Sequence, residues 1–130
     1  MKCNLSLFKK RKSSVKQNRS LVNWIALEKV EQLEELNKLS ETHIVLIFKH
    51  STSCGISKMV LKRFEDSFDE SAKKLKTFYL DLLNFRSISN QVATKYGVVH
   101  QSPQLLIIKN KTVVNHASHH SILDIELKNI

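Results

Sequence analysis

Cysteine, proline and long apolar runs are all scarce in this sequence of 130 residues, which holds two cysteines and one proline. Without a recognisable secretory leader, two cysteines indicate free thiols in a reducing compartment, so we expect a cytoplasmic protein. No apolar run approaches the roughly 20 residues that cross a bilayer, so we expect no membrane span. A chain of this length can bury a sufficient core as one domain without disulfides or metals.

Acidic residues are absent from residues 1–20, which contain seven lysines and arginines. The net charge of +9 therefore belongs mainly to this segment. We interpret it as a basic, disordered N-terminal extension that precedes a domain of residues 21–130. Its basic residues could bind an anionic surface. The alternative, a segment that only increases solubility, is the more common case for a run of charges. We expect no specific nucleic-acid partner.

Apolar spacing predicts the elements of the domain. Alternation of strands with helices predicts parallel pairing, and a closing hairpin adds an antiparallel edge. We therefore expect an α/β fold with a central mixed β-sheet flanked by helices on both faces, and this order is compatible with a thioredoxin-like fold. The predicted elements are a short edge strand at 21–25, a helix at 28–39, strands at 43–50 and 77–83, a helix at 56–68, a helix at 88–96 ended by Gly97, a hairpin of 104–110 and 111–117 turning at Asn110-Lys111, and a last helix capped by Ser118.

The stretch FKHSTSC places Cys54 between a buried strand and the first turn of a helix. Unpaired N–H groups and the helix dipole at this point favour a thiolate, which is the nucleophilic form of cysteine. Lys49, His50 and Lys58 could strengthen the positive field. Free cysteine is also common in protein cores, so an inert buried Cys54 is the competing interpretation.

The second thiol of a C-x-x-C pair is missing, because Ser57 stands three positions after Cys54. Serine cannot form a disulfide. We therefore expect a monothiol mechanism, in which Cys54 takes a small-thiol adduct from a substrate and keeps it until an external thiol removes it.

Two further segments could surround the cysteine. Gln101-Ser102-Pro103 comes directly before a predicted strand, where a proline is tolerated because it needs no ladder hydrogen bond. In thioredoxin-like proteins a proline here is cis and lies against the active cysteine. The segment HASHHS, with Ser118 and His119, stands at a strand-to-helix junction that could hold a carboxylate. Its histidine spacing matches no familiar zinc pattern, so we expect no metal site.

Several motifs in order resemble the monothiol bacilliredoxins, the YtxJ-like proteins of the bacillithiol system. They are FKHSTSC-x-IS, YLDLL-x-x-R, HQSPQLL and HASH, and the resemblance spans about residues 23–127. It implies a thioredoxin-like, cytosolic bacterial enzyme that removes bacillithiol from mixed disulfides on proteins. Its partners would be S-thiolated proteins and a low-molecular-weight thiol co-substrate, bacillithiol, with no bound cofactor. Cys54 would be the nucleophile, and the expected substrate-binding residues are Ser53, Gly55, Ser57, Gln101, Ser102, Pro103, Ser118 and His119.

Gly55 departs from this family, where a proline or another residue with a side chain is more frequent. The resulting CGIS resembles the CGFS of monothiol glutaredoxins, which carry [2Fe–2S] clusters. A cluster carrier is therefore one alternative function. A non-catalytic redox-sensing adaptor that uses the basic extension is another.

Overall fold

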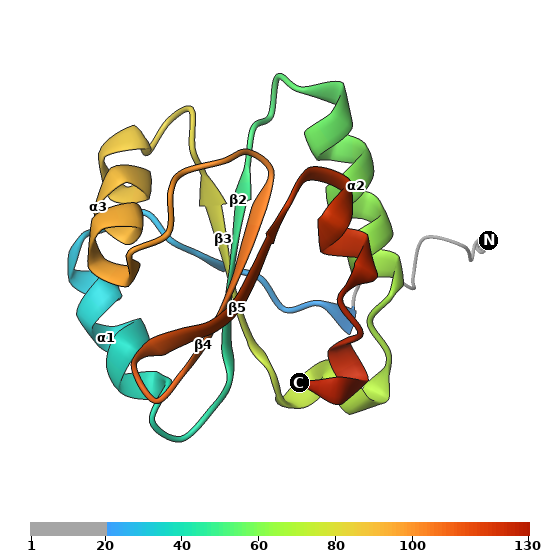
Figure 1. Cartoon of the computed structure of the whole chain (residues 1–130), viewed down its shortest axis with the longest axis horizontal. Coiled ribbons are helices and arrows are strands. Elements are labelled where there is room, and N and C mark those ends of the chain that lie inside the picture. Colours follow the sequence, from blue (N-terminus) through green and yellow to red (C-terminus); the bar gives the residue numbers. More distant parts are fainter. Residues whose placement is uncertain (1–20) are drawn as a thin grey trace, which may run out of the picture.

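The computed structural model describes residues 21–130, and the predicted N-terminal extension lies outside these described residues. A five-stranded sheet has the order β1-β3-β2-β4-β5 (Figure 1). The strands are β1 (Ile25–Ala26), β2 (Val45–His50), β3 (Lys76–Asp81), β4 (Gln104–Lys109) and β5 (Thr112–Ser118). The α-helices are α1 (Glu31–Leu39), α2 (Gly55–Asp66) and α3 (Arg86–Tyr96). The 3-10 helices are η2 (Glu70–Lys74), η3 (His119–Asp124) and η4 (Leu127–Asn129).

Helices cover both faces of the sheet, as the sequence predicted. Leu46 and Phe48 of β2 belong to an apolar cluster with α2 and the C-terminal segment. Val45 and Ile47, which point to the opposite face, belong to a second cluster with α1 and α3. All six residues of β2 are buried, which explains its unbroken apolar run. Figure 1 shows α1 and α3 on one side of the sheet and α2 on the other.

Strand β4 corrects one part of the predicted topology. Strands β1 and β2 pair parallel to β3, as expected for strands joined through helices. Although β4 also follows a helix, it runs antiparallel to β2. The reason is the long connection after Gly97, which brings the chain back to the end of the sheet where α3 begins (Figure 1). The loop before β4 therefore lies at the same end of the sheet as the N-terminus of α2.

Two predicted backbone features are present. Gly97 ends α3 in the left-handed conformation with φ of 67°, which glycine adopts without steric cost. Asn110 and Lys111 join β4 to β5 with φ of 51° and 69°, so both central residues of the hairpin turn lie in the left-handed region.

The predicted C-terminal α-helix is wrong, because the chain there forms the short segments η3 and η4. Ile122 and Leu127 both reach the core, but Ile125 between them is extended and interrupts the helix. The apolar positions 123, 125 and 127 alternate, which suits an extended chain better than a helical face. Ser118 makes no capping hydrogen bond and is the last residue of β5.

Other boundaries differ by a few residues from those predicted. The short first strand lies at Ile25–Ala26, α1 starts at Glu31, and β3 ends at Asp81. The helix η2 was not predicted, and the Asp69 side chain begins it by accepting a hydrogen bond from the Ser71 N–H. Over residues 21–130, no helix has both the length and the apolar character required to cross a membrane.

Candidate active site

Cys54 lies where the sequence placed it, directly before α2. It is the N-cap residue, with an extended backbone at φ −105° and ψ 122°. Its carbonyl oxygen accepts the first hydrogen bond of the helix from Lys58 N–H at 3.0 Å. The thiol is free and half-buried. An N-cap side chain lies beside the N–H groups of the first turn that have no intrahelical partner.

Ser57, in the place of a second thiol, is fully buried beneath the loop that carries Cys54. Its Oγ accepts a hydrogen bond from the Ser51 N–H at 3.1 Å and lies 2.7 Å from Nδ1 of His50. Helix α2 is thereby tied to the last residue of β2 and to the loop that follows. The serine is part of a hydrogen-bonded network, so its hydroxyl does not simply fill the space of a missing sulfur.

The segment before β4 forms a second wall at this end of the sheet. The peptide bond between Ser102 and Pro103 is cis. The Pro103 carbonyl accepts a hydrogen bond from the N–H of His119 at 2.9 Å. Within residues 21–130, Oγ of Ser102 is buried and has no hydrogen-bond partner. Gln101 is exposed beside it.

Gln104 connects this segment to the end of β5. Its buried side-chain amide donates to the carbonyl of Val99 at 3.0 Å and to Oγ of Ser118 at 3.4 Å. The structure therefore brings together Pro103, Ser118 and His119, which the sequence placed in two separate motifs. His119 has a left-handed backbone with φ of 56° and an exposed side chain.

The remaining predicted residues, Ser53 and Gly55, flank Cys54 at the surface. The Ser53 hydroxyl lies 3.4 Å from that of Ser51 and does not cap α2. Gly55 is the first residue of α2, and a Cβ built on it would meet no atom within 4 Å. The site can therefore accommodate a side chain at position 55.

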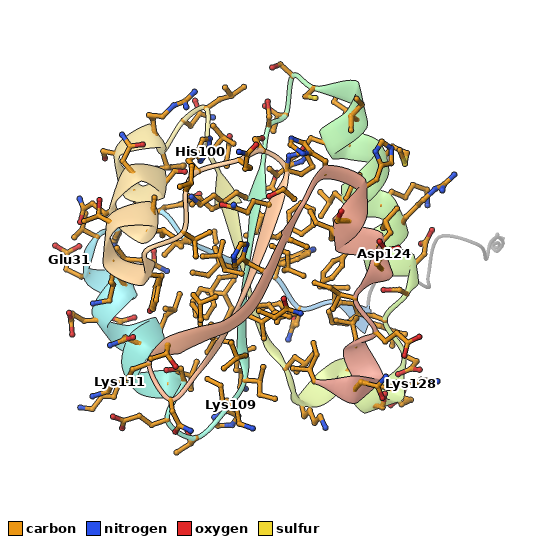
Figure 2. The ribbon with its side chains drawn as sticks, viewed as in Figure 1. Glu31, His100, Lys109, Lys111, Asp124 and Lys128 are labelled. Atoms are coloured by element: carbon orange, nitrogen blue, oxygen red, sulfur yellow. The ribbon has the colours of Figure 1, made fainter. Side chains whose placement is uncertain are left out.

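Lys49 lies on the other face of the sheet, among α3 residues. It is fully buried, and its Nζ donates to the Ser89 carbonyl at 3.2 Å and lies 3.4 Å from Nδ1 of His100. Burial lowers the pKa of Lys49 from 10.5 to about 8. Figure 2 shows His100 toward the opposite end of the sheet from Lys109 and Lys111. The lysine therefore links α3 to His100, which belongs to the loop that leads to Pro103.

His50, the last residue of β2, and His100 both favour the neutral form. Burial lowers the pKa of His50, and Lys58 lowers it further, while the charge of Asp81 opposes this change. Burial also lowers the pKa of His100, with further lowering by Lys49 and Arg86. The two imidazoles are thus available as hydrogen-bond acceptors at neutral pH.

From the sequence, His50 and Lys49 were expected only as sources of positive charge. The pairing of His50 with Ser57 was not predicted, and no role was predicted for Asp81, His100 or Gln104. The available signal was the placement of two polar residues at the end of an otherwise apolar strand. That pattern indicates buried side chains that need partners, although it does not identify those partners.

The fold and this site define the class of thioredoxin-like oxidoreductases. One similar solved structure is a proposed oxidoreductase with a thioredoxin fold, at 27% identity and TM-score 0.68, covering 78% of this chain and 88% of that one. Thioredoxin from Trypanosoma brucei brucei is 20% identical with TM-score 0.65, covering 82% and 88% of the two chains. Thioredoxin from Malassezia sympodialis is 19% identical with TM-score 0.64, covering 80% and 87%.

A family model described as monothiol bacilliredoxin BrxC matches residues 25–127. The chain therefore belongs to the BrxC family of monothiol bacilliredoxins, as the motifs around Cys54 and Pro103 predicted.

Proposed function

We propose that this protein is a monothiol thiol–disulfide oxidoreductase that removes bacillithiol from mixed disulfides on other proteins. The observation that carries the proposal is the position of Cys54, which is half-buried at the N-cap of α2 and has a serine where a second thiol would stand. Family membership supports bacillithiol as the small thiol.

The first chemical step exchanges one disulfide for another. The Cys54 thiolate attacks the bacillithiol sulfur of the substrate's mixed disulfide. The bond between the two substrate sulfurs breaks, a new bond joins Cys54 to bacillithiol, and the substrate protein leaves as a thiolate that takes a proton from water. Because the Ser57 hydroxyl cannot attack the new disulfide, the adduct stays on Cys54.

The second step needs an external thiol. A second bacillithiol, as its thiolate, attacks the bacillithiol sulfur held on Cys54. The bond to Cys54 breaks, the disulfide of two bacillithiol molecules leaves, and the Cys54 thiolate is restored. Over both steps the substrate cysteine is reduced and one free bacillithiol is oxidised, since it leaves joined by a disulfide to the bacillithiol that came from the substrate.

The walls of the site suit a protein substrate. Within the described residues, the backbone N–H and carbonyl of Ser102 have no backbone hydrogen-bond partner, so they can pair with an extended segment of the substrate. Ile56 and Val99 are 50% and 81% exposed at the same end of the molecule and offer apolar contact. We assign substrate contact also to Ser53, Gly55, Gln101, Ser118 and His119.

Turnover with a defined substrate tests this function. A model protein carrying one bacillithiol adduct is incubated with the enzyme and excess bacillithiol, and its reduction is followed by intact mass. We expect reduction with the parent protein and loss of the enzyme-dependent rate with Cys54→Ser. Equal rates with the two proteins would refute the proposal. Replacing bacillithiol by glutathione in adduct and co-substrate tests whether the small thiol is assigned correctly.

A further inference from the structure

The imidazole of His50 contacts the first turn of α2. It is 4% exposed, and its Nδ1 lies 2.7 Å from the fully buried Oγ of Ser57. The same oxygen accepts the N–H of Ser51 at 3.1 Å. A hydroxyl has one proton and two lone pairs, so the state of His50 decides where the Ser57 proton can point.

The two protonation states of His50 have different consequences for Ser57. When Nδ1 carries no proton, it can only accept, and the Ser57 hydroxyl donates to it. When His50 is charged, Nδ1 becomes a donor, and Ser57 Oγ then accepts from both Nδ1 and the Ser51 N–H. Its own proton is free to turn away from the imidazole.

The first turn of α2 determines what that proton can reach. Cys54 is the N-cap and Ser57 is the third residue of the helix. An N-cap side chain and the third helical residue face one another, as in the capping box, where each bonds to the other's backbone. No hydrogen bond joins Ser57 Oγ to the Cys54 sulfur in the structure, so the freed hydroxyl stabilises the thiolate only if it turns toward the sulfur across this turn. A charge-assisted hydrogen bond to a thiolate is stronger than one to a neutral group.

We propose that His50 is a positioning residue that controls the reactivity of Cys54 through Ser57. Neutral His50 with its proton on Nε2 holds the Ser57 hydroxyl away from the sulfur, and charged His50 releases that hydroxyl to stabilise the thiolate. The inference rests on the proposed function, because it concerns the same thiol. It adds a residue that acts through another side chain and touches neither the substrate nor the sulfur.

The groups packed around His50 leave its imidazole mostly neutral. From β3, Asp81 raises the pKa of His50, and Tyr79 packs its ring 5.7 Å from the imidazole. From α2, Lys58 lowers that pKa, and burial lowers it most. Oδ1 of Asp81 is buried and unpartnered within residues 21–130, so an acceptor for a charged imidazole lies on the neighbouring strand.

The coupling must be reciprocal. If a charged His50 favours the thiolate, then the thiolate favours a charged His50 by the same free energy. Formation of the bacillithiol adduct removes the negative charge from Cys54, and His50 then returns to its neutral form at a given pH. The protonation of His50 should therefore follow the state of the thiol during each turnover.

Side-chain NMR of the parent histidines tests this without altering the site. A Cys3→Ser background leaves Cys54 as the single thiol. The imidazole signals of His50 are titrated in the reduced protein and again after Cys54 is capped with iodoacetamide. We expect the His50 signals to respond to thiol ionisation in the reduced protein alone. Identical titrations before and after capping would overturn the proposal.

The rate of Cys54 alkylation against pH gives the second test. The plot for the parent should show two inflections. At pH values below the lower inflection, the alkylation rate should be roughly fivefold higher than expected for a thiol that ionises in one step. The gain is limited because a stabilised thiolate is also a weaker nucleophile. His50→Asn and Ser57→Ala should both remove the lower inflection, and the control His100→Asn should keep it.

Each result has one consequence. A lower inflection that survives in His50→Asn, or one missing from the parent, refutes the role of His50. A lower inflection that survives in Ser57→Ala shows a direct effect of charge and refutes the role of Ser57. Bacillithiol removal is measured separately, with Cys54→Ser as its control. If that activity is absent, the proposed function fails while the two titrations remain valid.

Discussion

Lys49 donates a hydrogen bond from its Nζ to the carbonyl oxygen of Ser89 at 3.2 Å, deep between β2 and α3. No charged carboxylate among the described residues forms a salt bridge with this fully buried amine. A charged group that loses its water without gaining a counter-ion is unfavourable. The lysine therefore lowers stability while it links α3 to His100 in the loop before Pro103.

The pH dependence of this cost can be predicted. The pKa of Lys49 is about 8 in the folded protein, whereas its ordinary value is 10.5. Between pH 8 and pH 10.5, Lys49 is therefore mainly neutral in the folded protein and mainly protonated in the unfolded chain. Below pH 8 the cost is complete, on the order of 3 kcal/mol, and it disappears as the pH rises to 10.5. Lys49→Met should thus stabilise the protein at pH 7, by about 1 kcal/mol or more.

Urea unfolding at pH 7 and at pH 10 measures this effect. The advantage of Lys49→Met over the parent should shrink at the higher pH, because the parent regains stability there. Lys29→Met, at an exposed position, is the matched control and should change little at either pH. A Lys49→Met variant less stable than the parent at both pH values would show that the hydrogen bond to Ser89 outweighs the cost of burial.

Restoring the second thiol should change the mechanism. Ser57→Cys places a sulfur one helical turn from Cys54, and a buried cysteine is well tolerated. The new thiol should attack the adduct on Cys54, release the small thiol and form an intramolecular disulfide. Intact mass after one turnover should show the loss of two hydrogens in place of the adduct. A variant that keeps the adduct as the parent does would mean that the two sulfurs cannot approach.

The two glycines should respond oppositely to alanine. At Gly55 a Cβ meets nothing within 4 Å, so Gly55→Ala should stabilise the protein by about 0.5–1 kcal/mol through helix propensity. Gly97 has a φ of 67°, and a Cβ is strained in this left-handed region. Gly97→Ala should therefore lower the free energy of unfolding by about 1 kcal/mol. Thermal or urea unfolding of both variants checks this. Destabilisation by Gly55→Ala would reveal a backbone requirement for glycine beside Cys54.

The alternative of a cluster carrier has a simple test. Iron–sulfur clusters need several thiolate ligands, and Cys54 is the one cysteine in residues 21–130. If the protein works by thiol exchange, anaerobic incubation with iron, sulfide and a small thiol should leave a colourless protein whose size in solution is unchanged. A visible chromophore together with dimer formation would support the cluster carrier instead.

Much of the fold followed from apolar spacing. The buried run around Phe48 and the stripe of α2 are strong local patterns, and Gly97 and Asn110 mark their own turns through backbone preference. The direction of β4 did not follow, because it depends on the path of the chain between Gly97 and Pro103. The last segment was mistaken for an α-helix because apolar residues at 122, 123, 125 and 127 fit a helix and an extended chain almost equally well.

The site was predictable in part for the same reason. Cys54 and Pro103 stand in motifs where position along the chain indicates a role. The partner of Ser57 was not predictable, since His50 reaches it only after β2 and α2 pack together. The junction of Pro103 with His119 likewise depends on how β4 and β5 pair.

Transfer of the adduct in a single turnover shows whether Cys54 accepts bacillithiol from a protein substrate. A protein carrying one bacillithiol adduct is mixed with an equimolar amount of the reduced Cys3→Ser protein, without free thiol, and intact masses are recorded over time. We predict that the adduct leaves the substrate and appears on Cys54 in equal amount, and that bacillithiol added afterwards restores the free thiol. A substrate that keeps its adduct, or loses it without any gain of mass on the Cys54 protein, would show that Cys54 is not the acceptor.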